Sequence, residues 1–144
     1  MNHEDYVSFE QAQRLKELGF DWECNHWYHP LEDKILESVD YSNHNRFERP
    51  YSAPTLSQAQ KWLREVKGIA VCVQSFDSNK DPRYGNFWWK EYFLPNCEER
   101  GPQWVEWWIS GNHPIFPNYE KALSDGISKM LELMNFKNPR IRGN

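Results

Sequence analysis

The sequence lacks the features that mark membrane, secreted and phosphate-binding proteins. None of its 144 residues belongs to an apolar run approaching the roughly 20 residues that cross a bilayer, and its acidic, polar start is unlike a secretory signal. Three cysteines are an odd number, so we expect free thiols and a cytoplasmic protein rather than a disulfide framework. The seven glycines all stand singly, which argues against a glycine-rich phosphate loop.

The chain also lacks a general excess of positive charge. Its net charge of −4 gives no broad attraction to nucleic acid or to anionic membranes. The imbalance is local, because residues 1–50 hold eleven acids against five bases (−6), and residues 51–144 hold ten against twelve (+2). These opposite signs favour packing of the two parts against each other.

Aromatic residues, in contrast, are abundant. They make up 16% of the chain and include eight tryptophans, each of which buries a large area. A chain of this length is expected to form a single domain, residues 1–144. We divide it into an N-terminal helix with an extended segment (1–51), a core of helices and strands (52–136) and a loose tail (137–144).

Two segments carry the same signals for a helix. Ser8 with Gln11 forms a capping-box pattern ahead of an apolar stripe that ends at Gly19, and Thr55 with Gln58 repeats it. The shared letters, "EQAQRLKELG" and "SQAQKWLREVKG", are what any short helix needs. Because the sequence diverges after each glycine, we interpret them as two helices rather than a duplicated module.

The pattern after residue 54 predicts a helix, three strands and a helix. Apolar spacing predicts helices at 55–67 and 119–134, and β-rich runs predict strands at 69–76, 87–95 and 104–110. Connectors of about ten residues favour antiparallel pairing, with both helices on one face. The predicted fold is therefore α+β: an antiparallel sheet of three to five strands around a helix-β-β-β-helix core (55–135), to which short strands from residues 20–51 add.

Three stretches carry a resemblance to a known family. They read "YVSFEQAQRLKELGF", "YSAPTLSQAQKWLREVKGI" and "YEKALSDGI". With them the chain resembles a family of short uncharacterised proteins encoded by gut anaerobes, their phages and their integrated elements. The similarity covers most of the chain except residues 75–117, which vary in the family. It implies a small cytoplasmic protein of phage, prophage or mobile-element type, with no assigned activity and no catalytic residues to transfer.

No motif predicts catalysis or a cofactor. Cys97 stands beside two glutamates, whose negative charge disfavours the thiolate that a nucleophile needs, and Cys72 lies within an apolar strand. The sharper possibility is a metal site at Cys24, His26 and His29, but zinc motifs combine two spaced ligand pairs and only one cluster is visible. We therefore expect no metal, no cofactor and no enzyme.

The order helix-β-β-β-helix also occurs in double-stranded-RNA-binding domains, so nucleic acid is the alternative partner. Those domains contact phosphates with basic groups at the start of the second helix. Here that helix opens with Glu120 and Asp125 against Lys121 alone, and the only basic cluster is in the tail. This chemistry disfavours nucleic acid.

The tryptophans give the most specific prediction. Alternation along the two later strands places Phe87, Trp89 and Phe93 toward the helices and a second aromatic set on the opposite face. That set consists of Trp88, Tyr92, Trp104 and Trp108, with Lys90 able to pair with Glu106 across the strands.

Two explanations of this second face are open. Either residues 20–51 cover it with Trp22, Trp27, Tyr28 and Tyr41, or part of it stays exposed as a docking patch for a partner or a second copy. We predict that at least two of the four side chains on the face are substantially exposed. The predicted function is that of a non-enzymatic accessory protein acting through protein contacts.

Overall fold

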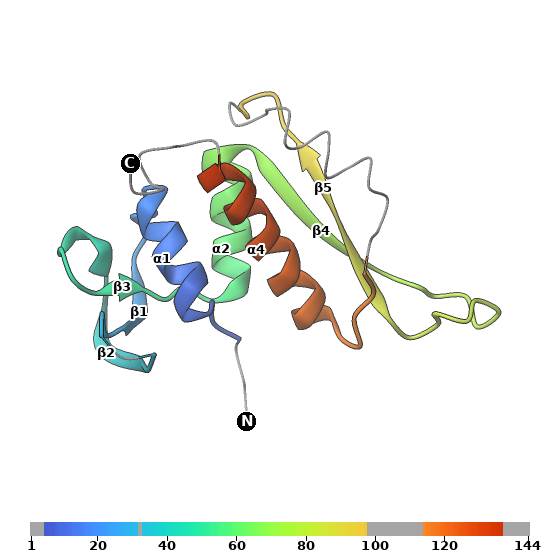
Figure 1. Cartoon of the computed structure of the whole chain (residues 1–144), viewed down its shortest axis with the longest axis horizontal. Coiled ribbons are helices and arrows are strands. Elements are labelled where there is room, and N and C mark those ends of the chain that lie inside the picture. The colour runs from blue at the N-terminus through green and yellow to red at the C-terminus, as the bar shows by residue number, and fades with distance from the viewer. Residues whose placement is uncertain (1–4, 32, 98–113, 137–144) are drawn as a thin grey trace.

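We describe a computed structural model of the chain over residues 5–31, 33–97 and 114–136. Helices α1, α2 and α4 lie in the middle of the molecule, with a small sheet on one side and a long hairpin on the other (Figure 1). The elements are α1 (Phe9–Glu17), β1 (Cys24–Tyr28), β2 (Ile35–Ser42), the 3-10 turn η1 (His44–Arg46), β3 (Tyr51–Ser52), α2 (Leu56–Trp62), the π-helical turn η2 (Leu63–Lys67), β4 (Ile69–Ser75), β5 (Phe87–Phe93) and α4 (Tyr119–Phe136).

The predicted α+β class with antiparallel strands is confirmed. The described strands form two sheets, one of three strands in the order β2-β1-β3 and one of two strands, β4-β5. The sequence led us to expect that strands from residues 20–51 add to the sheet of the hairpin. This expectation is wrong, because these strands build their own sheet on the other side of the helices (Figure 1). The predicted strand 104–110 and the predicted loose tail 137–144 lie outside the described residues.

Both predicted helix starts are present, and only one of them closes a capping box. The Ser8 hydroxyl accepts a hydrogen bond from the Gln11 N–H (3.1 Å), and the Ser8 N–H donates to Gln11 Oε1 (2.7 Å). At α2 the Thr55 hydroxyl caps the Gln58 N–H in the same way. The Gln58 side chain, however, donates to the Glu23 carbonyl (2.8 Å), so it ties α2 to the chain before β1.

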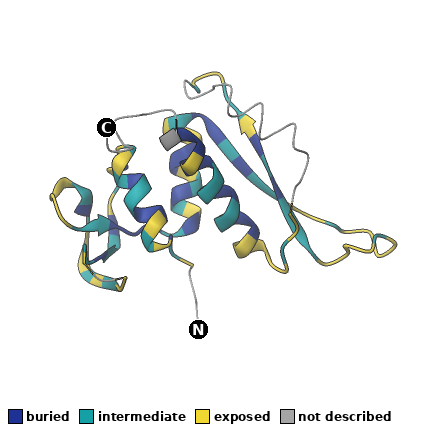
Figure 2. Ribbon diagram, in the orientation of Figure 1, coloured by how far each residue is buried: buried dark blue, intermediate teal, exposed yellow. Residues whose placement is uncertain are grey.

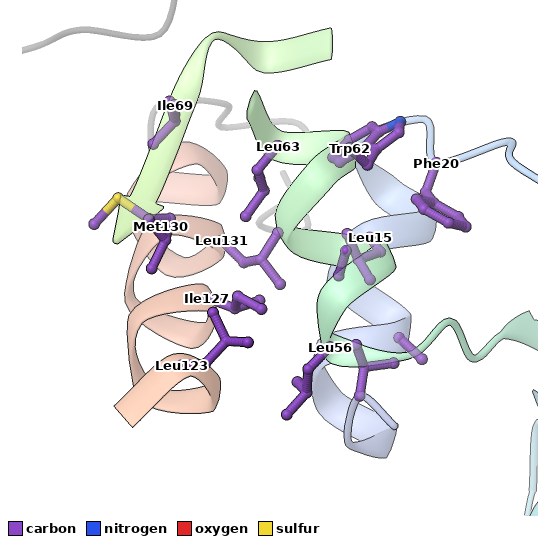
Figure 3. Close-up of a cluster of buried hydrophobic side chains, with 14 of the residues drawn as sticks. Leu15, Phe20, Leu56, Trp62, Leu63, Ile69, Leu123, Ile127, Met130 and Leu131 are labelled. Atoms are coloured by element: carbon purple, nitrogen blue, oxygen red, sulfur yellow. The ribbon is translucent and has the colours of Figure 1, made fainter. Parts of the chain in front are cut away.

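One core joins the helices to the hairpin. Figure 3 shows apolar side chains of α1, α2 and α4 meeting in this cluster together with Ile69 of β4. Val71 and Trp89 belong to the same buried cluster. As predicted, α2 and α4 bury their apolar stripes against the side of the hairpin that carries these residues.

The hairpin extends beyond the helices into an exposed loop (Figure 2). Within the described ranges, the helices are too short or too polar to cross a bilayer.

Candidate protein-binding face

The pairing of β4 with β5 divides the hairpin into two faces. Because directly paired residues of antiparallel strands share a face, the pairs Ile69–Phe93, Val71–Glu91 and Val73–Trp89 point toward the helices. The opposite face, called the outer face below, carries the pairs Ala70–Tyr92, Cys72–Lys90 and Gln74–Trp88. The predicted division of Phe87, Trp89 and Phe93 from Trp88 and Tyr92 is thus confirmed.

Two of the four predicted partner-binding residues lie on the described part of this face. Tyr92 is 42% exposed, and Trp88 is half-buried beside Phe76, with the two ring centroids 6.3 Å apart. The other two, Trp104 and Trp108, lie outside the described residues, as does Glu106. The exposure of at least two of the four therefore stays a prediction.

The aromatic row continues into the hairpin loop. The Phe76 N–H donates to the Asn86 carbonyl (3.0 Å), which extends the ladder one pair beyond β4. The Arg83 guanidinium lies 4.2 Å from the Phe76 ring centroid and donates two hydrogen bonds to Asp81 (2.8 and 3.0 Å). These bonds lower the pKa of the Asp81 carboxyl to about 2. The sequence pattern predicted only a loop here and gave no signal for the Arg83 guanidinium above the Phe76 ring.

The outer face combines aromatic surface with positive charge. Lys90 Nζ lies 5.2 Å from the Tyr92 ring centroid. No carboxylate stands among the six residues of the outer face.

Residues 20–51 do not cover the outer face, so the first of the two explanations is wrong. Their aromatic side chains make contacts on the other side of the helices: Trp22 with Phe20, Trp27 stacked on His44, and the Tyr28 hydroxyl donating to the Val7 carbonyl (2.7 Å). Tyr41 is exposed. The physical reason is that β1 pairs with both β2 and β3, which keeps this whole segment in a separate sheet.

A buried carboxyl on the helix-facing side was not anticipated. Glu91 is buried, and its Oε1 has no hydrogen-bond partner within the described part of the chain. Burial raises the pKa of this carboxyl, and its own backbone N–H and Lys90 offset the effect in part. Its neighbours on the same face, Val71, Trp89 and Phe93, are apolar or aromatic, so they supply no nucleophile or base beside it.

The three weak metal candidates are engaged in separate contacts. Cys24 is buried, which raises the pKa of its thiol, and the Sγ donates to the His26 carbonyl (3.3 Å). His26 Nδ1 lies 2.8 Å from Asn25 Oδ1, and His29 Nδ1 accepts a hydrogen bond from the Leu31 N–H (3.1 Å). In the described ranges, no three His, Cys, Asp or Glu side chains gather in a way that could hold a metal ion.

Sequence reasoning missed one buried histidine. His44 Nε2 lies 3.0 Å from the Cys24 carbonyl, and burial lowers the pKa of its imidazole. It stands in a polar run that shows no periodicity, so nothing in the sequence marks it. This contact and its stacking on the Trp27 ring hold His44 against β1.

Searches of protein-family models, curated proteins and solved structures found no match to this chain. The case for function therefore rests on the side chains themselves.

Proposed function

We propose that this protein is a non-enzymatic binding protein that contacts another protein through the outer face of its hairpin. The observation that carries the proposal is Tyr92, a large aromatic side chain that is 42% exposed on a face turned away from the helices. Aromatic residues are enriched at the centres of protein interfaces, where they contribute much of the binding energy.

Protein is favoured over nucleic acid as the partner. The described elements α2, β4, β5 and α4 follow the order helix, strand, strand, helix, and the third strand of the double-stranded-RNA alternative falls outside the described residues. The start of α4, however, is capped by Asn118, whose side chain accepts from the Lys121 N–H (2.8 Å), and it carries Glu120 in its first turn. A phosphate-binding helix start would carry basic groups there.

The setting we propose is the cytoplasm of a bacterium, with the protein acting as an accessory of a phage or mobile element. The resemblance of its three sequence stretches to proteins of that kind supports the proposal. Cys24, Cys72 and Cys97 are all free thiols, which agrees with a reducing compartment.

A capture experiment tests the proposed face. Tagged wild-type protein is compared with the double variant Trp88→Ala/Tyr92→Ala and with Val66→Ala, a control at an exposed apolar position on η2. We expect the double variant to lose the bound protein and Val66→Ala to retain it, since only the former lacks the aromatic surface. Capture by the double variant at the wild-type level would contradict the proposal.

Three accompanying measurements complete the test. Circular dichroism and the free energy of unfolding show whether the double variant is folded, and loss of binding counts only in a folded protein. A gel shift with single- and double-stranded nucleic acid tests the alternative. Binding that weakens steeply with rising salt would favour the nucleic-acid function instead.

A further inference from the structure

The small sheet has an open edge at β2. In the order β2-β1-β3, strand β2 pairs with a neighbour on one side only within the described part of the chain. Figure 1 shows β2 at the border of the small sheet, away from α2 and α4. An edge strand of this kind presents backbone N–H and C=O groups to which a further strand can add.

The middle of β2 is also released from β1. The pairing of the two strands breaks after Cys24 and resumes where His26 pairs with Glu37. Residues 38–41 therefore have only one residue of β1, Asn25, opposite them, although they belong to the extended strand. No other strand in the described ranges pairs with these four residues.

The side chains of this stretch are open to solvent. Val39 is 98% exposed and Tyr41 65%, and the carboxylates of Glu37 and Asp40 are exposed as well. Neither carboxylate forms an ion pair with a residue that the structure describes. An occupant of this edge must therefore cover apolar surface and supply hydrogen-bond donors to two acids.

The sequence of β2 is complementary to itself about Val39. Ser38 and Glu37 precede this valine, and Asp40 and Tyr41 follow it. When two copies of the strand pair antiparallel with Val39 opposite Val39, Glu37 faces Tyr41 of the second copy and Asp40 faces Ser38. Both hydroxyls can donate to the carboxylates that face them. Because a two-fold axis repeats each pair, all four carboxylates of the contact receive a hydroxyl donor.

Neighbouring registers lack this match. Shifting the second copy by one residue places Asp40 opposite Glu37 in one direction and opposite Val39 in the other. The first shift brings two carboxylates together, and the second sets a carboxylate against an apolar side chain, so both are unfavourable. The side chains of β2 thus select the register that is centred on Val39.

We propose that this protein forms a two-fold dimer in which β2 of one copy pairs antiparallel with β2 of a second copy, centred on Val39. The two three-stranded sheets then join into one continuous sheet. The contact uses the same surface on both copies, so it closes at the dimer. It lies outside the outer face of the hairpin and leaves that face open to another protein.

Analytical ultracentrifugation of the purified full-length protein tests the dimer. One strand edge makes a small interface, so we expect a dissociation constant between about 1 μM and 1 mM. Raising the salt concentration should lower it, because salt screens the repulsion among the four carboxylates. Val39→Asp adds two facing carboxylates and should raise the dissociation constant about tenfold or more. Val66→Asp, at an exposed valine on η2, should dimerise like the wild type.

An exchange of side chains tests the register. Tyr41→Glu places a carboxylate opposite Glu37 of the second copy, so it should weaken the dimer as Val39→Asp does. Adding Glu37→Tyr restores a tyrosine opposite a glutamate, and the double variant should dimerise like the wild type. A double variant as weak as Tyr41→Glu alone contradicts the register. Circular dichroism checks that each variant is folded.

Cysteine cross-linking locates the two-fold axis. Only a residue that lies opposite its own copy forms a symmetric disulfide across the contact. In a background with Cys72→Ser and Cys97→Ser, mild oxidation should therefore link Val39→Cys into a covalent dimer and leave Val66→Cys monomeric. Equal linking of the two variants contradicts the pairing.

The outcomes separate this inference from the proposed function. A wild type that stays monomeric up to about 1 mM overturns the dimer, and so does a Val39→Asp variant that assembles like the wild type. Species larger than a dimer contradict a contact that closes. Trp88→Ala/Tyr92→Ala should dimerise normally, and loss of self-association in this variant alone would place the second copy on the outer face instead. Capture of another protein by Val39→Asp tests the outer face independently.

Discussion

Replacement of Gly126 by alanine tests how α4 packs on the hairpin. A Cβ at this position would lie 2.7 Å from Val71 Cγ1 and 2.9 Å from Trp89 Cδ2, whereas ordinary van der Waals contacts begin at 3.4 Å. Neither neighbour moves easily. Val71 is fixed in the β4-β5 ladder, and the Trp89 indole N–H donates to Asp125 Oδ2 (2.9 Å).

Two opposing effects set the expected magnitude. In an unobstructed helix interior, Gly→Ala stabilises by about 1 kcal/mol, because alanine has less backbone freedom to lose. Overpacking of a rigid core destabilises by about 1–3 kcal/mol. Because the added methyl meets two fixed side chains at once, we expect a net loss of about 1 kcal/mol in the free energy of unfolding, within the range these effects allow.

Chemical denaturation followed by circular dichroism measures this difference. The matched control is the pair Glu132→Ala and Glu132→Gly at an exposed position of the same helix. There the alanine variant should be the more stable by about 1 kcal/mol. If Gly126→Ala is stabilised by a similar amount, the close approach of α4 to the hairpin is refuted. Combining Gly126→Ala with Val71→Ala should cost less than the sum of the two, since the second change removes one clashing methyl.

Three further predictions concern stability. Gly68→Ala should destabilise by more than Gly85→Ala. Both glycines have positive φ, but a Cβ at Gly68 would lie within 3 Å of the segment after β5, whereas a Cβ at Gly85 meets nothing within 4 Å. Equal losses in the free energy of unfolding would contradict the structure. Lys16→Met should lower the free energy of unfolding by about 1.5–3 kcal/mol, because the Lys16 ammonium donates to three carbonyls within residues 47–50 at 2.7–2.8 Å. An unchanged denaturation midpoint would show that these bonds contribute nothing to stability. Glu91→Gln should remove a pH dependence of stability. Because burial raises the pKa of Glu91, the folded state holds the proton more tightly, so the wild type loses stability as pH rises from about 4.5 through the folded pKa while the glutamine variant does not. Parallel curves of stability against pH for the two proteins would refute this.

The helices and strands around the core follow from the sequence because their signals are local. A cap such as Ser8 with Gln11 acts within three residues, and the apolar stripe of α4 repeats within each turn. Alternation along β5 likewise separates Trp88 from Trp89 without any knowledge of their surroundings. These properties depend on backbone geometry that is the same in every helix or strand.

Contacts between distant segments could not be predicted in this way. Gln58 has the sequence of a capping box, yet its side chain binds the Glu23 carbonyl, because α2 packs beside the chain that enters β1. Glu91 alternates onto the helix-facing side like its neighbours, but its burial depends on how the chain folds over that side. The register shift between β1 and β2 after Cys24 depends on which residues of β2 pair with β1, a choice that composition does not encode.

The sequence by itself thus determined that the hairpin has two aromatic faces, and only the tertiary structure decided which segment stays away from the outer one. Trp27 and Tyr28 are aromatic side chains of the kind that could have covered Trp88 and Tyr92. They are held elsewhere because β1 is hydrogen-bonded on both edges, to β2 and to β3, and because the helices separate that sheet from the hairpin. Hydrophobic burial is not directional, so the same side chains could have filled either place; the backbone hydrogen bonds of β1, which are directional, selected one.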